Sequence, residues 1–122
     1  MAAARFQFRV ARSADEGTGT HVTWRLLATN NRDLGRSSTV FPDLVTCEAA
    51  VLRLRRENAA LQAVTTRTGP TSWSWRIIQG DTVVAVSSRA YQRRIQADYA
   101  GGVVLALIPE ADIAAFRPGS AT

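Results

Sequence analysis

Hydrophobic and polar residues alternate in the first segment of the chain. Phe6, Phe8 and Val10 are separated by Gln7 and Arg9, which is the two-residue period of a strand buried on one face. Similar patterns, bounded by turn-forming residues, predict five further strands. These predicted strands cover residues 22–29, 32–38, 61–66, 73–78 and 82–88.

A different period begins after the third predicted strand. Leu44, Cys47, Val51 and Leu54 are spaced three or four residues apart, which places them on one stripe of an amphipathic helix. Asp43 suits the positive end of the helix dipole. We therefore expect Cys47 on the core side of this helix, as a small apolar residue.

The last third of the chain predicts a short helix and a final strand. Tyr91, Ile95 and Tyr99 lie four residues apart, a helical spacing, and Gly101–Gly102 is expected to end this helix. The next run, Val103–Ile108, is apolar at every position. Such a run is typical of a strand that is buried on both faces near the middle of a sheet.

The two halves of the chain carry matching blocks. Residues 24–27 (Trp-Arg-Leu-Leu) match residues 75–78 (Trp-Arg-Ile-Ile), which lie 51 positions further on. Residues 37–41 (Ser-Ser-Thr-Val-Phe) match residues 87–91 (Ser-Ser-Arg-Ala-Tyr), which lie 50 positions further on. We interpret the blocks as a tandem repeat. A unit of about 50 residues makes a marginal core alone, so the two units are expected to share one sheet.

The predicted fold class is therefore α+β, with two tandem β(3)-α-β repeats that form one largely antiparallel sheet with two helices on one face. The first repeat is expected at residues 5–60 and the second at residues 61–108. Residues 109–122 would be a C-terminal tail of one joint globular domain. Trp24 and Trp75 occupy equivalent positions and should point toward the helices.

The repeated blocks resemble a known family. The run Trp-Arg-Leu-Leu-Ala-Thr-Asn-Asn at residues 24–31, then Ser-Ser-x-x-Phe at residues 37–41 and then a helix, is similar to the modules of the YegP-like family. Those modules carry an aromatic-x-Leu-Lys-Ala-x-Asn-Gly hairpin, a Ser-x-x-Tyr motif, an alanine-rich helix and a Gly-Ile-x-x-Val strand. The resemblance covers residues 5–108 and implies a joint sheet in which terminal strands are exchanged between the units. It implies no particular activity, because the family has no established one to transfer.

Composition adds charge to this picture. All 15 basic residues are arginine, 10 residues are acidic, and the net charge is +5. Arginine suits planar, bidentate recognition of anions, and coding bias in a GC-rich genome is the alternative explanation for the missing lysine.

A single cysteine excludes an internal disulfide framework and favours a cytoplasmic location. No apolar run approaches the about 20 residues of a membrane helix, so no membrane partner is expected.

Patterns for catalysis and metal binding are weak. Cys47 and His21 are the single cysteine and the single histidine, which excludes a multi-cysteine or histidine-rich zinc site. A Cys–His nucleophile pair would require a thiol on the apolar helix stripe to meet an imidazole at a strand entrance. Ser38 and Ser88 lack a neighbouring histidine base, and we expect them to cap the helices that follow. The prediction is a protein that is not an enzyme, with no catalytic residue, cofactor or metal.

The helix-free face of the predicted sheet carries the candidate binding residues. Arg9, Arg25 and Arg76 would project from it, and Arg25 and Arg76 are equivalent in the repeat. Leu27 and Ile78 are expected beside them, where they could support self-association or an unknown protein partner.

Two functions stay open. The first is a small non-catalytic binding or scaffolding protein with an unknown ligand. The second is weak, salt-sensitive binding of nucleic acid or another anion through the arginines. A face merely covered by aliphatic arginine stems is the simpler alternative.

Overall fold

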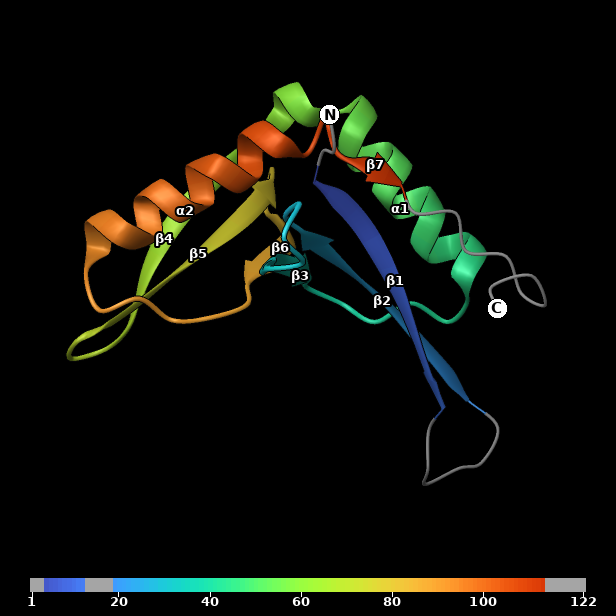
Figure 1. Cartoon of the computed structure of the whole chain (residues 1–122), viewed down its shortest axis with the longest axis horizontal. Helices are drawn as coiled ribbons and strands as arrows, with labels where there is room; N and C mark the ends of the chain where they lie inside the picture. Colours follow the sequence, from blue (N-terminus) through green and yellow to red (C-terminus); the bar gives the residue numbers. More distant parts are fainter. Residues whose placement is uncertain (1–3, 13–18, 114–122) are drawn as a thin grey trace.

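The computed structural model describes residues 4–12 and 19–113, which form two helices and one seven-stranded sheet (Figure 1). Residues 13–18 and the part of the predicted C-terminal tail beyond residue 113 lie outside the described residues. The helices are α1 (Leu44–Arg56) and α2 (Arg94–Leu107), and a 3-10 turn covers Asn58–Ala60. The strands are β1 (Arg5–Arg12), β2 (Thr20–Leu27), β3 (Asp33–Ser37), β4 (Leu61–Gly69), β5 (Ser72–Gln79), β6 (Thr82–Ser87) and β7 (Asp112–Ile113).

The strand order across the sheet is β4-β5-β6-β3-β2-β1-β7. Each pairing is antiparallel except that of β1 with β7. This arrangement confirms the predicted α+β class and the largely antiparallel sheet. Within the described part of the chain, neither helix has the length and apolar character needed to cross a membrane.

Trp75 shows that the two halves of the sheet share one buried face. Its ring covers Gly35 on β3, where an added Cβ atom would lie 2.5 Å from Cη2 of Trp75. Gly35 pairs with Leu26 on β2, and directly opposed residues point to the same face. Because residues two positions apart in a strand also share a face, Trp24 lies on the face that Trp75 occupies. Both indoles are almost completely buried.

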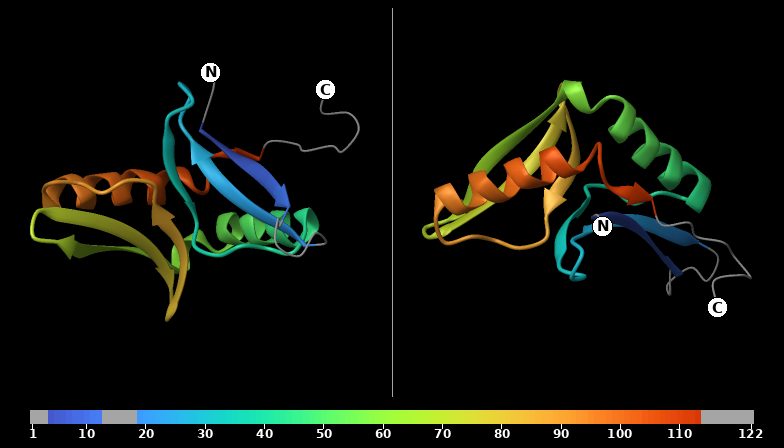
Figure 2. Two further views of the ribbon diagram at one scale, coloured as in Figure 1. Left: turned by 90° about the horizontal axis from the view of Figure 1, so that it is seen from below. Right: turned by 45° about the horizontal axis from the view of Figure 1, so that its top comes forward.

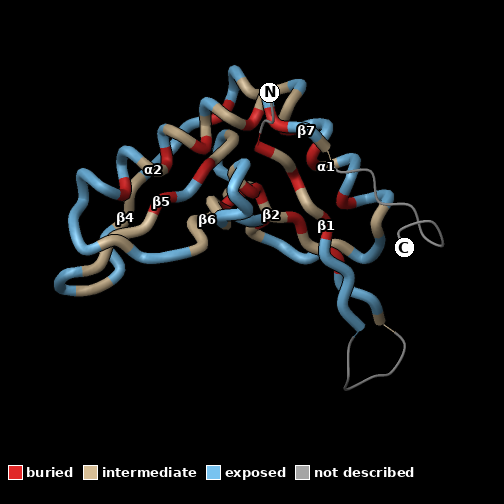
Figure 3. The backbone as a smooth tube through the Cα atoms, in the orientation of Figure 1, coloured by how far each residue is buried: buried red, intermediate tan, exposed pale blue. Residues whose placement is uncertain are grey.

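Both helices cover this face, as Figures 1 and 2 show. Helix α1 lies against β1 and β2, and α2 lies against β4 and β5. The apolar stripe of α1 is buried as predicted, at Cys47, Val51 and Leu54. Figure 3 shows the buried segments where strands and helices face each other, whereas the far end of the β1–β2 hairpin is exposed.

The prediction of a strand at Val103–Ile108 is wrong, because α2 continues through Gly101 and Gly102 as far as Leu107. At Gly101 α2 lies in close contact with the sheet, since an added Cβ atom there would lie 3.0 Å from Cβ of Trp75. A larger residue would hold the helix away from the indole. The glycine therefore serves a close helix–sheet contact rather than a helix end.

The prediction that Tyr91, Ile95 and Tyr99 share a short helix is confirmed for Ile95 and Tyr99, which lie in α2, and is wrong for Tyr91. Tyr91 precedes α2 and forms an isolated bridge with Trp73, while Ile95 and Tyr99 are 73% and 76% exposed. The final strand is the two-residue β7, which pairs in parallel with β1 at the opposite edge from β4.

β3 and β6 meet at the centre of the sheet. Arg36 pairs with Val86, and on either side of this pair Gly35 faces Ser87 and Ser37 faces Ala85. The register is therefore centred on two residues that are 50 positions apart in the sequence. A half-turn about an axis through this central pair exchanges the two antiparallel strands.

Other irregular features recur with the same spacing. Bridges join Val22 to Phe41 and Trp73 to Tyr91. The register shifts after Leu26 in the β2–β3 pair and after Ile77 in the β5–β6 pair, where the unpaired extra residues are Leu34 on β3 and Val84 on β6. These features support the interpretation of a tandem repeat, while the bounds of the two repeats stay a prediction.

The prediction that Ser38 and Ser88 cap the helices is wrong. The hydroxyl of Ser38 donates to the backbone oxygen of Val83 at 2.6 Å, and the hydroxyl of Ser88 donates to the carboxylate of Asp33. Each serine therefore links one half of the sheet to the other. Asp43 is the N-cap of α1, where its side chain accepts a hydrogen bond from the backbone N–H of Thr46 at 2.7 Å.

Candidate anion-binding face

One row of side chains crosses the helix-free face of the sheet. The strand pairings place Gln7 beside Arg25, Arg25 beside Arg36, Arg36 beside Val86, and Val86 beside Arg76. Each member of this row alternates along its strand with residues of the buried face, so the row points away from both helices. We call Arg25, Arg36 and Arg76 the arginine row.

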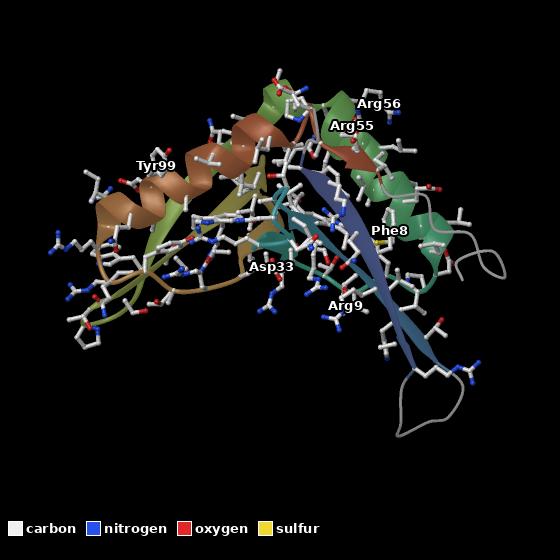
Figure 4. The ribbon with its side chains drawn as sticks, in the orientation of Figure 1. Phe8, Arg9, Asp33, Arg55, Arg56 and Tyr99 are labelled. Atoms are coloured by element: carbon white, nitrogen blue, oxygen red, sulfur yellow. The ribbon has the colours of Figure 1, made fainter. Side chains whose placement is uncertain are left out.

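Arg9 lies on the same face, one step beyond the row. It is two residues after Gln7 on β1, pairs with Thr23, and is exposed. In Figure 4 Phe8 points toward α1, whereas Arg9 points to the other side of the strand. The structure thus places Arg9, Arg25 and Arg76 together on the helix-free face, and their binding role stays a prediction.

Arg36 is the member of the row that sequence reasoning missed. It stands between Gly35 and Ser37, two small buried residues, and neither has the apolar side chain that marks an inward position. A glycine within a strand can signal the close approach of another group. Had Gly35 been read as inward-facing on that ground, Arg36 would have been assigned to the open face.

The arginines of the row have different surroundings. Arg25 donates from Nη2 to Oε1 of Gln7 at 2.7 Å, and its Nη1 lies 3.5 Å from Oδ2 of Asp33. Its Nε is buried and has no acceptor within the described residues. Within residues 4–12 and 19–113, no ion pair reaches Arg9, Arg36 or Arg76. Arg36 is thus directly opposed to another arginine in the sheet, and no carboxylate of the described residues forms an ion pair with it.

Two hollows lie on this face and share Arg36. The first, which we call the β2 hollow, measures about 230 Å³ and is lined by Arg9, Arg25, Arg36 and the hydroxyl residues Thr23 and Thr39. The second, the β5 hollow, measures about 390 Å³ and is lined by Arg36, Arg76, Arg89 and the hydroxyl residues Thr68 and Ser74. Each hollow therefore combines three arginines with side-chain hydroxyls, a set of groups that can donate hydrogen bonds to an anion.

Two larger hollows lie on the helix side of the sheet. One of about 670 Å³ lies between α1 and β6, and one of about 600 Å³ lies between α2 and β3. Each is built from the helix of one half and the central strand of the other half. Exposed Ile95 and Tyr99 line the hollow between α2 and β3. In the hollow between α1 and β6, Ala49 stands at the position that corresponds to Tyr99.

The expected apolar companions of the arginines are not on an exposed surface. Leu27 is 4% exposed and Ile78 is half-buried. The prediction that both side chains are exposed beside Arg25 and Arg76 is therefore wrong for Leu27. Leu27 therefore does not contribute to an exposed self-association surface, and self-association itself stays a prediction.

The Cys–His pair considered from the sequence does not form. Cys47 is completely buried in the core, whereas His21 is exposed on β2, and no hydrogen bond joins them. Burial raises the pKa of the Cys47 thiol to about 11, so the thiol stays protonated at neutral pH and is a poor nucleophile. Within the described residues, no three acidic, histidine or cysteine side chains gather as metal ligands would.

Comparison with known proteins identifies the fold. No family model matches the chain, and no curated protein matches it in sequence. Its fold is similar to that of YegP from E. coli, a protein of unknown function, with a TM-score of 0.64 and 11% identity over 93% of this chain and 92% of that one. It is also similar to a UPF0339 protein from Shewanella oneidensis, with a TM-score of 0.61 and 10% identity over 88% of each chain. The resemblance to YegP-like proteins that the motifs predicted is thus confirmed at the level of the fold.

Proposed function

We propose that this protein is a non-catalytic binding protein whose ligand is an anion, held on the helix-free face by the arginine row. The observation that carries this proposal is the direct pairing of Arg25 with Arg36 across β2 and β3. Like charges at directly opposed positions destabilise a sheet. A bound anion would relieve this repulsion, so the folded face favours occupancy by negative charge.

The charges around the row support the proposal. Asp33, the acidic residue in contact with the row, pairs with Arg25 at 3.5 Å and also accepts a hydrogen bond from Ser88. It therefore does not neutralise Arg36 or Arg76. Guanidinium groups form strong bidentate hydrogen bonds with phosphate and carboxylate, and both arginines are exposed and available for this contact.

The proposal includes no chemical step. The thiol of Cys47 lies in the core with its pKa raised, and the arginines serve as hydrogen-bond donors. The proposal also places the protein in the cytoplasm. The free cysteine supports this location, because secreted proteins of this size usually form disulfides.

A binding measurement tests the proposal. The purified protein is titrated into fluorescently labelled polyanions, namely oligonucleotides and inorganic polyphosphate, at about 50 mM salt and at raised salt. We expect binding at low salt that weakens as salt increases. Arg36→Gln should lower the affinity about tenfold, the loss expected for one charged hydrogen-bonding group.

Arg56→Gln is the matched control, because it removes the same charge from the helix side at the end of α1 (Figure 4). It should change the affinity by less than about twofold. The proposal is wrong if no polyanion binds at low salt, or if Arg36→Gln and Arg56→Gln have equal effects.

A further inference from the structure

We infer that the anion is a nucleic-acid duplex, whose two backbones contact the β2 hollow and the β5 hollow on either side of Arg36. This inference rests on the proposed function and names its ligand class. It depends on three observations: the matched construction of the two hollows, the symmetry that relates them, and the kinds of side chain that the face lacks.

The two hollows are built from corresponding residues. Arg25 and Thr23 in the β2 hollow correspond to Arg76 and Ser74 in the β5 hollow, each 51 positions further on. Each member of a pair offers the same type of donor, a guanidinium or a hydroxyl. The two hollows therefore suit two anionic groups of the same kind, and phosphate takes both types of donor.

The symmetry of the sheet relates the two hollows. The register of β3 and β6 is centred on the pair of Arg36 and Val86, and β2 and β5 are the outer neighbours of these strands. A half-turn about an axis through this pair brings Arg25 to the position of Arg76. Arg36 stands beside the axis, which explains why it lines both hollows.

A duplex matches this symmetry and a single strand does not. The two backbones of a duplex run antiparallel and are related by twofold axes perpendicular to the helix, and two-fold protein sites on duplex DNA use this match. A single strand has one direction, so it would present different faces to two sites related by a half-turn. Two hollows related by this half-turn are therefore best filled by phosphates from opposite strands.

The separation of the two hollows suits the same ligand. Three strand spacings lie between β2 and β5, and at about 4.8 Å each they separate Arg25 from Arg76 by roughly 14 Å along the sheet. The major groove of B-DNA is about 12 Å wide between its backbones. Extended arginine side chains can adjust for this difference.

Among the described residues, the helix-free face carries no exposed aromatic ring of the kind that proteins use to bind single strands. Trp24 and Trp75 are buried on the helix side, and Trp73, two positions before Trp75, carries the guanidiniums of Arg67 and Arg94 over its ring. Stacking of unpaired bases on aromatic rings supplies much of single-strand affinity. The contacts on this face are therefore to phosphates, and binding is expected to be independent of base sequence.

The experiment compares three probes that carry equal numbers of phosphates: a duplex, a single strand that cannot fold, and inorganic polyphosphate. We expect the duplex to bind at least about tenfold more tightly than either of the others at low salt, the ratio that corresponds to one lost charged contact in each weaker complex. Arg25→Gln and Arg76→Gln should each weaken duplex binding by a similar factor. Each should also lower the slope of log affinity against log salt by about one.

Arg25 also holds Gln7 and Asp33, so thermal unfolding of each variant is measured beside binding. Arg9→Gln, at an exposed position in the β2 hollow, is the second variant on that side, and Arg56→Gln is the charge-matched control. Equal binding of duplex and single strand, or a loss confined to one hollow, would overturn the inference and leave the proposed function standing. A failure of every probe to bind would overturn the proposed function itself.

Discussion

Gly35 is the residue at which a missing side chain determines how the core is packed. A Cβ atom at this position would meet ring carbons of Trp75 at 2.5 and 3.0 Å and the backbone oxygen of Val86 at 3.3 Å. Protein interiors have no free volume to absorb such an overlap. The absence of a side chain lets an indole from the second half of the chain cover a strand of the first. The sequence shows a glycine in a strand, but it does not show which ring approaches it.

Cys47 gives the fold a dependence on alkaline pH. Burial raises the pKa of its thiol from 9.0 to about 11. Between these values the unfolded chain loses the thiol proton while the native protein keeps it, so the free energy of unfolding falls as pH rises. The stability that comes from the raised pKa of the Cys47 thiol is fully present below pH 9 and is lost as pH rises toward 11. We expect the urea unfolding midpoint of the wild type to fall across this pH window. The midpoint of Cys47→Ala should fall less steeply with pH.

Cys47→Ala also removes a buried group, so its midpoint at pH 7 will be lower than that of the wild type. The relevant readout is therefore the change between pH 8 and pH 10.5 within each protein. If the variant and the wild type lose stability in parallel, other groups cause the alkaline loss. Slow alkylation of the thiol in the native protein, compared with the unfolded chain, is an independent check of its burial.

At the scale of the element, α2 shows why a continuous apolar run is ambiguous. Val104 and Ile108 are buried and four residues apart, whereas Ala106 between them is exposed, which is helical periodicity. The side chains at the remaining positions are apolar too, so the sequence contains no polar residue to reveal this period. Short apolar runs fit a buried strand or a buried helix equally well. The length of α2 was thus not predictable from the pattern.

The two helices begin differently, and this difference predicts a stabilising substitution. Asp43 caps α1, and the hydrogen bond from Thr46 lowers the pKa of its carboxyl. The stability that the ionised cap contributes is therefore present at pH values above the usual pKa of the carboxyl, and it is lost as pH falls through the lowered pKa. The corresponding residue of α2 is Arg93, whose side chain makes no capping hydrogen bond. Arg93→Asp should raise the free energy of unfolding by about 1 kcal/mol.

Urea unfolding with an unchanged m-value is the appropriate measurement. Arg93→Ala is the control, because it removes the same positive charge at the start of α2 without supplying an acceptor. Equal midpoints for the two variants would show that charge removal, rather than capping, accounts for any gain.

At the scale of the whole molecule, the sequence predicted most of the fold and part of the candidate site. Strand alternation placed Trp24 and Trp75 on one face and therefore placed Arg25 and Arg76 on the other, as the structure has them. The sequence did not reveal that β3 and β6 are neighbours, because pairing between distant strands leaves no local pattern. The shared position of Arg36 between two hollows follows from that pairing, whereas the opposition of Arg25 and Arg36 comes from the pairing of β2 with β3.

The central pairing also predicts that binding and stability oppose each other in this molecule. Arg36 faces Arg25 on one side and Val86 on the other, so Arg36→Val removes a like-charge pair and creates a pair of β-branched residues. We expect the free energy of unfolding to rise by roughly 0.5–1 kcal/mol while polyanion binding weakens.

Arg76→Val separates the two causes of this gain, because Arg76 faces Val64 and Val86 and has no directly opposed arginine. It gains the same strand propensity without relieving repulsion. Unfolding of both variants is measured at low and at high salt. Salt screens the repulsion between the two arginines, so the rise in the free energy of unfolding caused by Arg36→Val should fall toward that caused by Arg76→Val as salt increases. If the two gains are equal at low salt, the opposed guanidiniums do not repel each other in the folded protein. The energetic reason for an anion to occupy this face would then be absent.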